Sequence, residues 1–221
     1  MVDFQERDTR RGFDEPSEPD DEPEFEPEDE PEADHGEPDD HGHDHDDHDH
    51  DKGHHAHDLD HLGVGVLTVS SSRTLESDPS GDAIEAAVEA EGHEVVSREL
   101  VGDSHDRVQQ TIGALAARRD VDILVSTGGT GVTPDDVTIE AVRPLIDKQL
   151  PGFGELFRAL SFEDIGPRVV ATRATAGIVD GVPVFCMPGS EAAVTLGIEE
   201  IVLPVAGHLA GLAHEEELEE E

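Results

Sequence analysis

Short apolar runs and helical segments alternate along residues 62–213, and this alternation constrains the fold more than any other feature of the sequence. Runs of β-branched and other apolar residues predict strands at 64–69, 94–100, 121–126 and 182–187. Helices are expected at 82–90, with Asp82 as the N-cap, and at 106–118, 140–148 and 155–160. Residues 191–212 indicate one or two closing helices that Pro204 interrupts. Strands separated by helices predict an α/β fold with three layers, α/β/α, and a mostly parallel sheet.

Acidic residues are concentrated toward the two ends of the chain. The 221 residues include 55 acidic and 14 basic ones, a formal net charge of −41. Residues 1–61 hold 26 acidic residues, 4 basic residues and 10 of the 14 histidines. They have too little apolar surface to offset about 1–2 kcal/mol of backbone entropy per ordered residue. We therefore expect a disordered acidic His-rich tail over 1–61, one folded domain over 62–213 and an acidic C-terminal tail over 214–221.

The composition also excludes several classes of protein. So negative a chain is a poor nucleic-acid binder, because binding requires basic residues to displace counterions from phosphates. No run approaches the roughly 20 apolar residues of a membrane span, and the N-terminus lacks the pattern of a secretory signal. The single cysteine, Cys186, favours a reducing, cytoplasmic compartment and is expected to be buried and without a catalytic role. An acidic domain whose only lysine is Lys148 resembles the proteins of salt-in halophiles such as haloarchaea.

Chemistry in such a fold is expected where the parallel strands end. Glycines follow the third predicted strand, so backbone N–H groups there can approach a phosphate closely. A second glycine turn follows the last predicted strand. Hydroxyl, basic and acidic side chains follow the predicted strands at 64–69 and 94–100. The candidate residues at this edge are Ser70, Arg73, Asp103, Thr127, Gly128, Gly129, Thr130, Gly131, Asp136, Pro188, Gly189 and Ser190. Each alone could be an ordinary turn or cap residue; their common position at one edge favours a binding site, with Asp103 and Asp136 able to hold a divalent ion.

Four motifs in order carry a resemblance to a known family: Thr127-Gly-Gly-Thr-Gly131, Asp136-Val-Thr138, Pro151-Gly-Phe-Gly-Glu155 and Met187-Pro-Gly-Ser190. Together they resemble the MogA/MoaB-type molybdopterin adenylyltransferases of molybdenum cofactor biosynthesis. Residues 157–166 and 173–177 are most similar to the MoaB branch. The resemblance covers about residues 63–212 and leaves both tails outside it.

The resemblance implies a molybdopterin-binding fold and the Mg²⁺-dependent reaction of ATP with molybdopterin to give adenylylated molybdopterin and pyrophosphate. It implies that Asp103 and Asp136 are the catalytic and Mg²⁺-binding acids. The glycine-rich loop and Pro188–Ser190 would bind nucleotide and substrate, with Ser70 and Arg73 as further candidates. It also implies a homotrimer or homohexamer and hand-off of the product to the molybdenum-inserting enzyme.

Two other functions stay open at this point. The chain could be a non-catalytic molybdopterin-binding or scaffold member of the same family, although the presence of both acids favours an enzyme. Alternatively, the His/Asp-rich tract at residues 41–57 could make it a metal-handling protein, because alternating imidazoles and carboxylates bind transition metals.

Overall fold

The computed structural model describes residues 58–218, and side chains through His214. Most of the predicted N-terminal tail, residues 1–57, lies outside the described residues. Its last residues belong to the fold: the Leu59 N–H donates to the Gly207 carbonyl at 3.1 Å. Leu59 is also partly buried and packs against the hydrophobic core. The folded part therefore includes residues on the N-terminal side of the predicted boundary.

A six-stranded sheet with the order β2-β1-β3-β6-β5-β4 organises the fold. Its four parallel strands are β1 (Gly63–Val69), β2 (Glu94–Val101), β3 (Ile123–Thr127) and β6 (Val182–Met187), close to the four predicted ranges. Two antiparallel strands, β5 (Thr175–Val179) and β4 (Lys148–Gln149), complete the sheet and were not predicted. The sheet is therefore mostly parallel, as expected, with an antiparallel edge.

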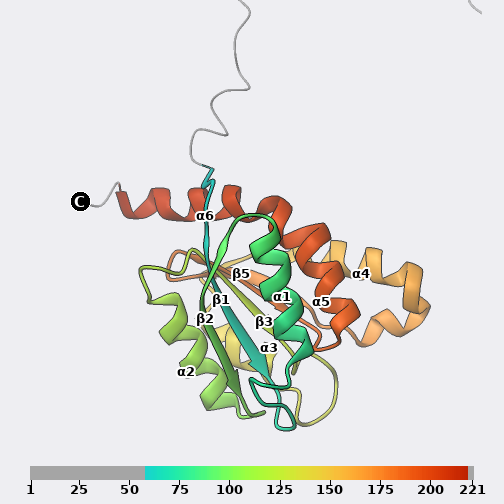
Figure 1. Cartoon of the computed structure of the whole chain (residues 1–221). Helices are drawn as coiled ribbons and strands as arrows, with labels where there is room; N and C mark the ends of the chain where they lie inside the picture. The colour runs from blue at the N-terminus through green and yellow to red at the C-terminus, as the bar shows by residue number, and fades with distance from the viewer. Residues whose placement is uncertain (1–57, 219–221) are drawn as a thin grey trace, which may run out of the picture. The chain divides into compact units, whose positions relative to one another are not determined.

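Helices cover both faces of the sheet (Figure 1). One face packs against α1 (Pro79–Ala90), α4 (Pro151–Ile165), α5 (Glu191–Gly197) and α6 (Leu203–Leu218). The other packs against α2 (His105–Ala116) and α3 (Thr138–Val142). Alternate residues of β1 enter the two cores: Val64 and Val66 face the first, and Leu67 and Val69 the second. This arrangement confirms the predicted three-layer α/β/α fold.

Several helix boundaries differ from the prediction, mainly at prolines. Helix α1 begins at Pro79 with Asp78 at the N-cap position, so the prediction that Asp82 caps it is wrong. The predicted helix 140–148 is also wrong: α3 ends at Val142, and the 3₁₀ turn η1 (Arg143–Leu145) leads into β4. Pro144 explains this, because its ring cannot continue the α-helical hydrogen-bond pattern. Helix α4 is longer than the predicted 155–160. It begins at Pro151, because proline is favoured in the first turn of a helix, and it runs to Ile165. The 3₁₀ helix η2 (Gly166–Ala171) follows it.

Pro204 does not interrupt the closing helix, contrary to the prediction. A π-helical turn, η3 (Ile198–Val202), joins α5 to α6, and its wider backbone relieves the clash between a proline ring and the preceding carbonyls. Helix α6 then runs to Leu218, into the predicted C-terminal tail. By length and composition the stretch Glu191–His214 is apolar enough to cross a membrane. Its apolar side is instead buried in the first core through Val194, Ile198, Val202, Ala206 and Ala210.

Candidate functional site

The sequence-predicted residues lie at the carboxyl ends of the four parallel strands β1, β2, β3 and β6, at the edge of the sheet where the antiparallel strand β5 begins. Thr127 at the end of β3 is in register with Thr68 on β1 and Met187 on β6. Because β5 runs in the opposite direction, its first residue, Thr175, pairs with Cys186 near the end of β6. Residues just before β5 therefore lie at the same edge as the glycine-rich loop.

The glycine-rich loop is held by close backbone contacts that exclude side chains. Gly128 has φ of 95° and Gly129 has φ of 64°, conformations that L-residues rarely adopt. A Cβ on Gly128 would lie 2.3 Å from the Val69 carbonyl oxygen. The Gly128 N–H donates to the Met187 carbonyl at 3.0 Å, and the Thr127 hydroxyl donates to the Pro188 carbonyl at 3.0 Å. The loop therefore joins the ends of β1, β3 and β6.

Gly128→Ala is expected to destabilise the protein by about 1–3 kcal/mol, because it combines backbone strain with a clash against β1. Gly113→Ala is the matched control: a Cβ at Gly113, inside α2, would meet nothing within 4 Å. That change should stabilise the protein by about 0.5–1 kcal/mol. Urea denaturation of both variants measures the two effects. If the two variants had the same denaturation midpoint, the backbone at position 128 would not require glycine.

Asp136 lies beside this loop, and only one of its two carboxylate oxygens accepts hydrogen bonds from the described residues. Its Oδ2 accepts from the Thr133 N–H at 2.8 Å and from the Thr133 hydroxyl at 2.6 Å. Burial alone would raise the pKa of Asp136, but hydrogen bonds from Thr133 and Gly131 and the charge of Arg173 hold it below the ordinary value. Within the described residues Oδ1 accepts no hydrogen bond. Asp136 is therefore negatively charged at neutral pH and has an oxygen available to a ligand.

Asp103 is fixed by a reciprocal pair of hydrogen bonds with the loop after β1. Its Oδ2 accepts from the Ser71 N–H at 2.9 Å, and its own N–H donates to the Ser71 hydroxyl at 3.0 Å. Ser70 lies next to this pair, and its hydroxyl oxygen accepts from the Ser72 N–H at 3.3 Å. The predicted acids Asp103 and Asp136 thus belong to loops at the same edge of the sheet.

Both acids suit a magnesium ion that is bound mainly by substrate phosphates. Across residues 58–218, no three His, Cys, Asp or Glu side chains cluster as a metal site. Mg²⁺ does not require such a cage, since it commonly uses one or two carboxylates together with phosphate oxygens and water. The donor set of Asp103 and Asp136, each with one carboxylate oxygen free of hydrogen bonds within the described range, fits that mode.

Arg73 connects two loops of the site. Its Nη2 donates to the Gly189 carbonyl at 2.9 Å, and its Nη1 donates to the Ser80 hydroxyl at 2.8 Å. The Ser80 hydroxyl donates to the same Gly189 carbonyl at 2.8 Å. Ser190 caps α5, its hydroxyl accepting from the Ala193 N–H at 3.3 Å. Arg73 and Ser190 therefore hold the Pro188–Ser190 turn in place, and Arg73 is a positioning residue rather than a free cation.

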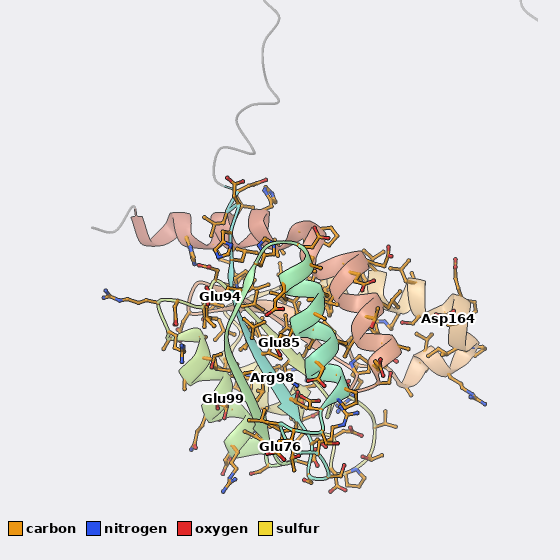
Figure 2. All side chains as sticks on the ribbon, viewed as in Figure 1. Glu76, Glu85, Glu94, Arg98, Glu99 and Asp164 are labelled. Atoms are coloured by element: carbon orange, nitrogen blue, oxygen red, sulfur yellow. The ribbon has the colours of Figure 1, made fainter. Side chains whose placement is uncertain are left out.

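The carboxylate of Asp78 is fully buried and forms an ion pair with Arg73. It accepts from the Thr68 hydroxyl at 2.6 Å and forms ion pairs with Arg73 and Arg98, each at 3.3 Å. Burial alone would raise the pKa of Asp78, but the hydrogen bonds and the Arg98 charge lower it below the ordinary value. Figure 2 shows Arg98 between strand β2 and helix α1, where it also pairs with Glu85 at 2.7 Å. This network was not predicted, although the turn Asp78-Pro-Ser-Gly81 at a helix start is a sequence signal for it.

Arg173 secures the other side of the glycine-rich loop. Its guanidinium donates to the Gly131 carbonyl at 2.7 Å and to the Asp136 carbonyl at 3.1 Å, and it forms an ion pair with Glu140 on α3. Its segment contributed to the family resemblance, but nothing in the local pattern assigned Arg173 a role. The contact exists because the antiparallel strand β5 starts at this edge.

Cys186 is buried in β6, as predicted. Burial raises the pKa of its thiol to about 12, so the sulfur is protonated at neutral pH. A buried, protonated thiol is a poor nucleophile.

Comparisons with known proteins agree with this geometry. Residues 65–208 match the family described as a probable molybdopterin binding domain. The molybdenum cofactor biosynthesis protein B of Halalkalibacterium halodurans is 45% identical over 145 residues, which are 65% of this chain and 85% of that protein. The protein of the same name from Bacillus subtilis is 43% identical over 145 residues, with coverage of 65% and 85%.

Solved structures give the same result. A crystal structure of a molybdenum cofactor biosynthesis protein B is 42% identical and has a TM-score of 0.68, covering 70% of this chain and 97% of that one. The tungsten cofactor synthesizing protein MoaB from Pyrococcus furiosus is 39% identical with a TM-score of 0.63, covering 70% and 98%. Sequence identity and a shared fold over nearly the whole length of these relatives confirm the predicted resemblance: the chain belongs to the MoaB family of molybdenum cofactor biosynthesis proteins.

Proposed function

We propose that this protein acts in molybdenum cofactor biosynthesis by transferring the adenylyl group of ATP to molybdopterin in a Mg²⁺-dependent reaction. The observation that carries the proposal is the glycine-rich loop at the sheet edge, with the charged carboxylate of Asp136 beside it. A backbone that approaches phosphates closely, next to a metal-binding acid, suits a reaction between two polyanions.

The reaction needs no nucleophile from the protein. An oxygen of the terminal phosphate of molybdopterin forms a bond to the α-phosphorus of ATP. The bond from that phosphorus to the oxygen bridging the α- and β-phosphates breaks, and pyrophosphate leaves with the electron pair. The work of the chain is then to position the two phosphates and to neutralise their charge.

Each loop has a distinct part in this scheme. Within the glycine-rich loop, the backbone N–H groups of Gly129 and Thr130 hold the nucleotide phosphates, because those of Gly128 and Gly131 are donated to the Met187 carbonyl and to Asp136. Asp103 and Asp136 would hold Mg²⁺, which when bound offsets the charge between the reacting phosphates. The Pro188–Ser190 turn, kept in place by Arg73, forms the opposite wall. Arg173 keeps the glycine-rich loop and Asp136 in a fixed relation.

An assay of the full chain with ATP, Mg²⁺ and molybdopterin tests the proposal. Adenylylated pterin, identified by mass spectrometry, should form in equal amount to the released pyrophosphate. Addition of EDTA should stop both. A folded protein that binds molybdopterin but never consumes ATP would instead be the non-catalytic binding member of the family.

Removal of residues 1–57 is expected to leave the rate of adenylyl transfer within about twofold, because the described site uses none of them. This boundary is preferable to a cut after residue 61, which would remove the Leu59 contact with Gly207. The measurement compares kcat for the full chain and the shortened one. Loss of activity on truncation would contradict a tail that is dispensable for the reaction.

A further inference from the structure

Two histidines lie side by side at the end of the parallel strands that is opposite to the glycine-rich loop. His61 comes just before β1 and His93 just before β2, and the first residues of these two strands, Gly63 and Glu94, are in register. The centres of the two imidazole rings are 6.3 Å apart. Figure 2 shows Glu94, at the start of β2, at the opposite end of the strands from Glu76, which follows β1. This histidine pair is therefore separate from the candidate functional site.

His61 is held in the tautomer that a metal-binding histidine needs. Its Nδ1 lies 2.7 Å from the Gly92 carbonyl oxygen. Because a carbonyl oxygen can only accept, Nδ1 carries the proton, and the lone pair of the neutral ring is then on Nε2. His61 is exposed, and its Nε2 makes no hydrogen bond to any residue of the described range. Histidines that bind metals commonly donate their other N–H to a backbone carbonyl in this way.

His93 has a ring nitrogen that lacks a partner. Its Nδ1 is buried and makes no hydrogen bond within residues 58–218. Buried polar atoms are normally paired, so such an atom indicates a group that a ligand can satisfy. Two imidazoles bound to one tetrahedral ion, with metal–nitrogen distances of about 2.0–2.1 Å, have ring centres roughly 5 Å apart. The observed separation of 6.3 Å is close to this value, and the exposed ring of His61 has room to move nearer.

The sequence provides further imidazoles directly beside the pair. In the part of the chain that the structure describes, no third His, Cys, Asp or Glu joins the two histidines as a metal site, and a zinc site needs more than two ligands. Residues 41–57 contain eight histidines, and the nearest three, His54, His55 and His57, precede His61 by four to seven residues. That separation is at most about 25 Å of extended chain, so these side chains can reach an ion held by His61.

We propose that His61 and His93 bind a divalent transition-metal ion of the Zn²⁺, Ni²⁺ and Cu²⁺ class, with histidines of residues 41–57 completing its coordination. Imidazole nitrogen suits these ions, whereas the Mg²⁺ of the proposed reaction prefers oxygen ligands. The exposed carboxylates of Asp60, Glu91 and Glu94, next to the pair in the chain, raise the local concentration of cations. The bound ion would join the His-rich segment to the folded domain, and this inference does not rest on the proposed function.

Titration of the full chain with Zn²⁺, in competition with a chromophoric chelator, tests the site. His61→Gln and His93→Gln should each weaken the tightest Zn²⁺ site by about tenfold or more, because each removes a ligand. His105→Gln is the matched control: it also removes one exposed histidine, but from the start of α2, where the ring pairs with Asp106. This control should bind Zn²⁺ as the unchanged protein does. If all three variants bind equally tightly, residues 41–57 bind the ion by themselves and the proposed site is overturned.

NMR signals of the histidine rings give a second readout in the unchanged full chain. With less than one equivalent of Zn²⁺, the ring signals of His61 and His93, assigned from the two variants, should shift. Shifts confined to other histidines would overturn the site. His61→Gln changes an exposed residue, so it keeps the titration valid if His93→Gln misfolds. Adenylyl transfer in saturating Mg²⁺ should be the same in His61→Gln and the unchanged protein, so either proposal can fail while the other stands.

Discussion

Replacing Asp136 by asparagine is expected to lower the kcat of adenylyl transfer by about 100-fold or more while leaving the fold intact. The asparagine side-chain oxygen can still accept the two hydrogen bonds from Thr133, so the loop should keep its shape. What is lost is the negative charge, which in the proposed reaction holds a divalent cation between the two sets of phosphates. The effect should fall mainly on kcat, because the charge of the metal matters most where the new bond forms.

The neighbouring residue provides a matched control for Asp136. Asp135 is exposed and makes no hydrogen bond through its side chain to any residue of the described range. Asp135→Asn changes the net charge of the same loop by the same amount and should alter kcat by no more than about twofold. Steady-state assays of the two variants over a range of Mg²⁺ concentrations give the comparison. Equal losses in both would mean that overall loop charge, and not the position of Asp136, supports the reaction.

Asp78→Ala is expected to destabilise the protein by about 3–5 kcal/mol, the largest effect on stability among the changes considered. Asp78 is fully buried, and its removal leaves the Thr68 hydroxyl and the Arg73 guanidinium without their shared acceptor. Arg73 would then be free to move, and its hold on the Gly189 carbonyl would weaken. We therefore expect weaker nucleotide binding as well as a lower denaturation midpoint, although Asp78 itself reaches no substrate.

Asp82→Ala is the control for Asp78→Ala because it removes another carboxylate that pairs with Arg98. The side chain of Asp82 is 65% exposed, so its ion pair at 2.7 Å should contribute less than about 1 kcal/mol. Urea denaturation at neutral pH measures both variants. If Asp78→Ala lowered the free energy of unfolding no more than Asp82→Ala does, burial would not be the reason that Asp78 stabilises the protein.

Acid should remove the contribution of Asp78 to stability. Its pKa is lowered in the folded protein relative to the ordinary value of 3.8, so the unfolded chain takes up the proton first as pH falls. The stabilisation is complete above that value and is lost as pH falls through the lower, folded pKa. The difference in unfolding free energy between the unchanged protein and Asp78→Ala should therefore shrink in that acidic range. A difference independent of pH would contradict a charged Asp78 in the folded state.

The elements that sequence reasoning missed share a physical cause. Strand β5 is short, and Ala176 and Gly177 interrupt its β-branched residues, so its local strand signal is weak; its pairing with β6 is what makes it a strand. The Asp180-Gly181 turn between them was a hairpin signal, with φ of 47° and 77°. Local rules predict that Pro204 breaks the helix, because they do not foresee the π turn that precedes it.

The amino-acid sequence by itself determined the parallel strands, the three-layer architecture, the glycine-rich loop and the candidate acids Asp103 and Asp136. These follow from local patterns: apolar runs, helical periodicity and glycines placed directly after strands. Only the tertiary structure decided that Arg73 is bound to Gly189, that Asp78 is buried beneath it and that Arg173 reaches the glycine-rich loop. Those contacts join residues far apart in the chain, and the direction of each side chain depends on how the strands and loops pack, which no local pattern records.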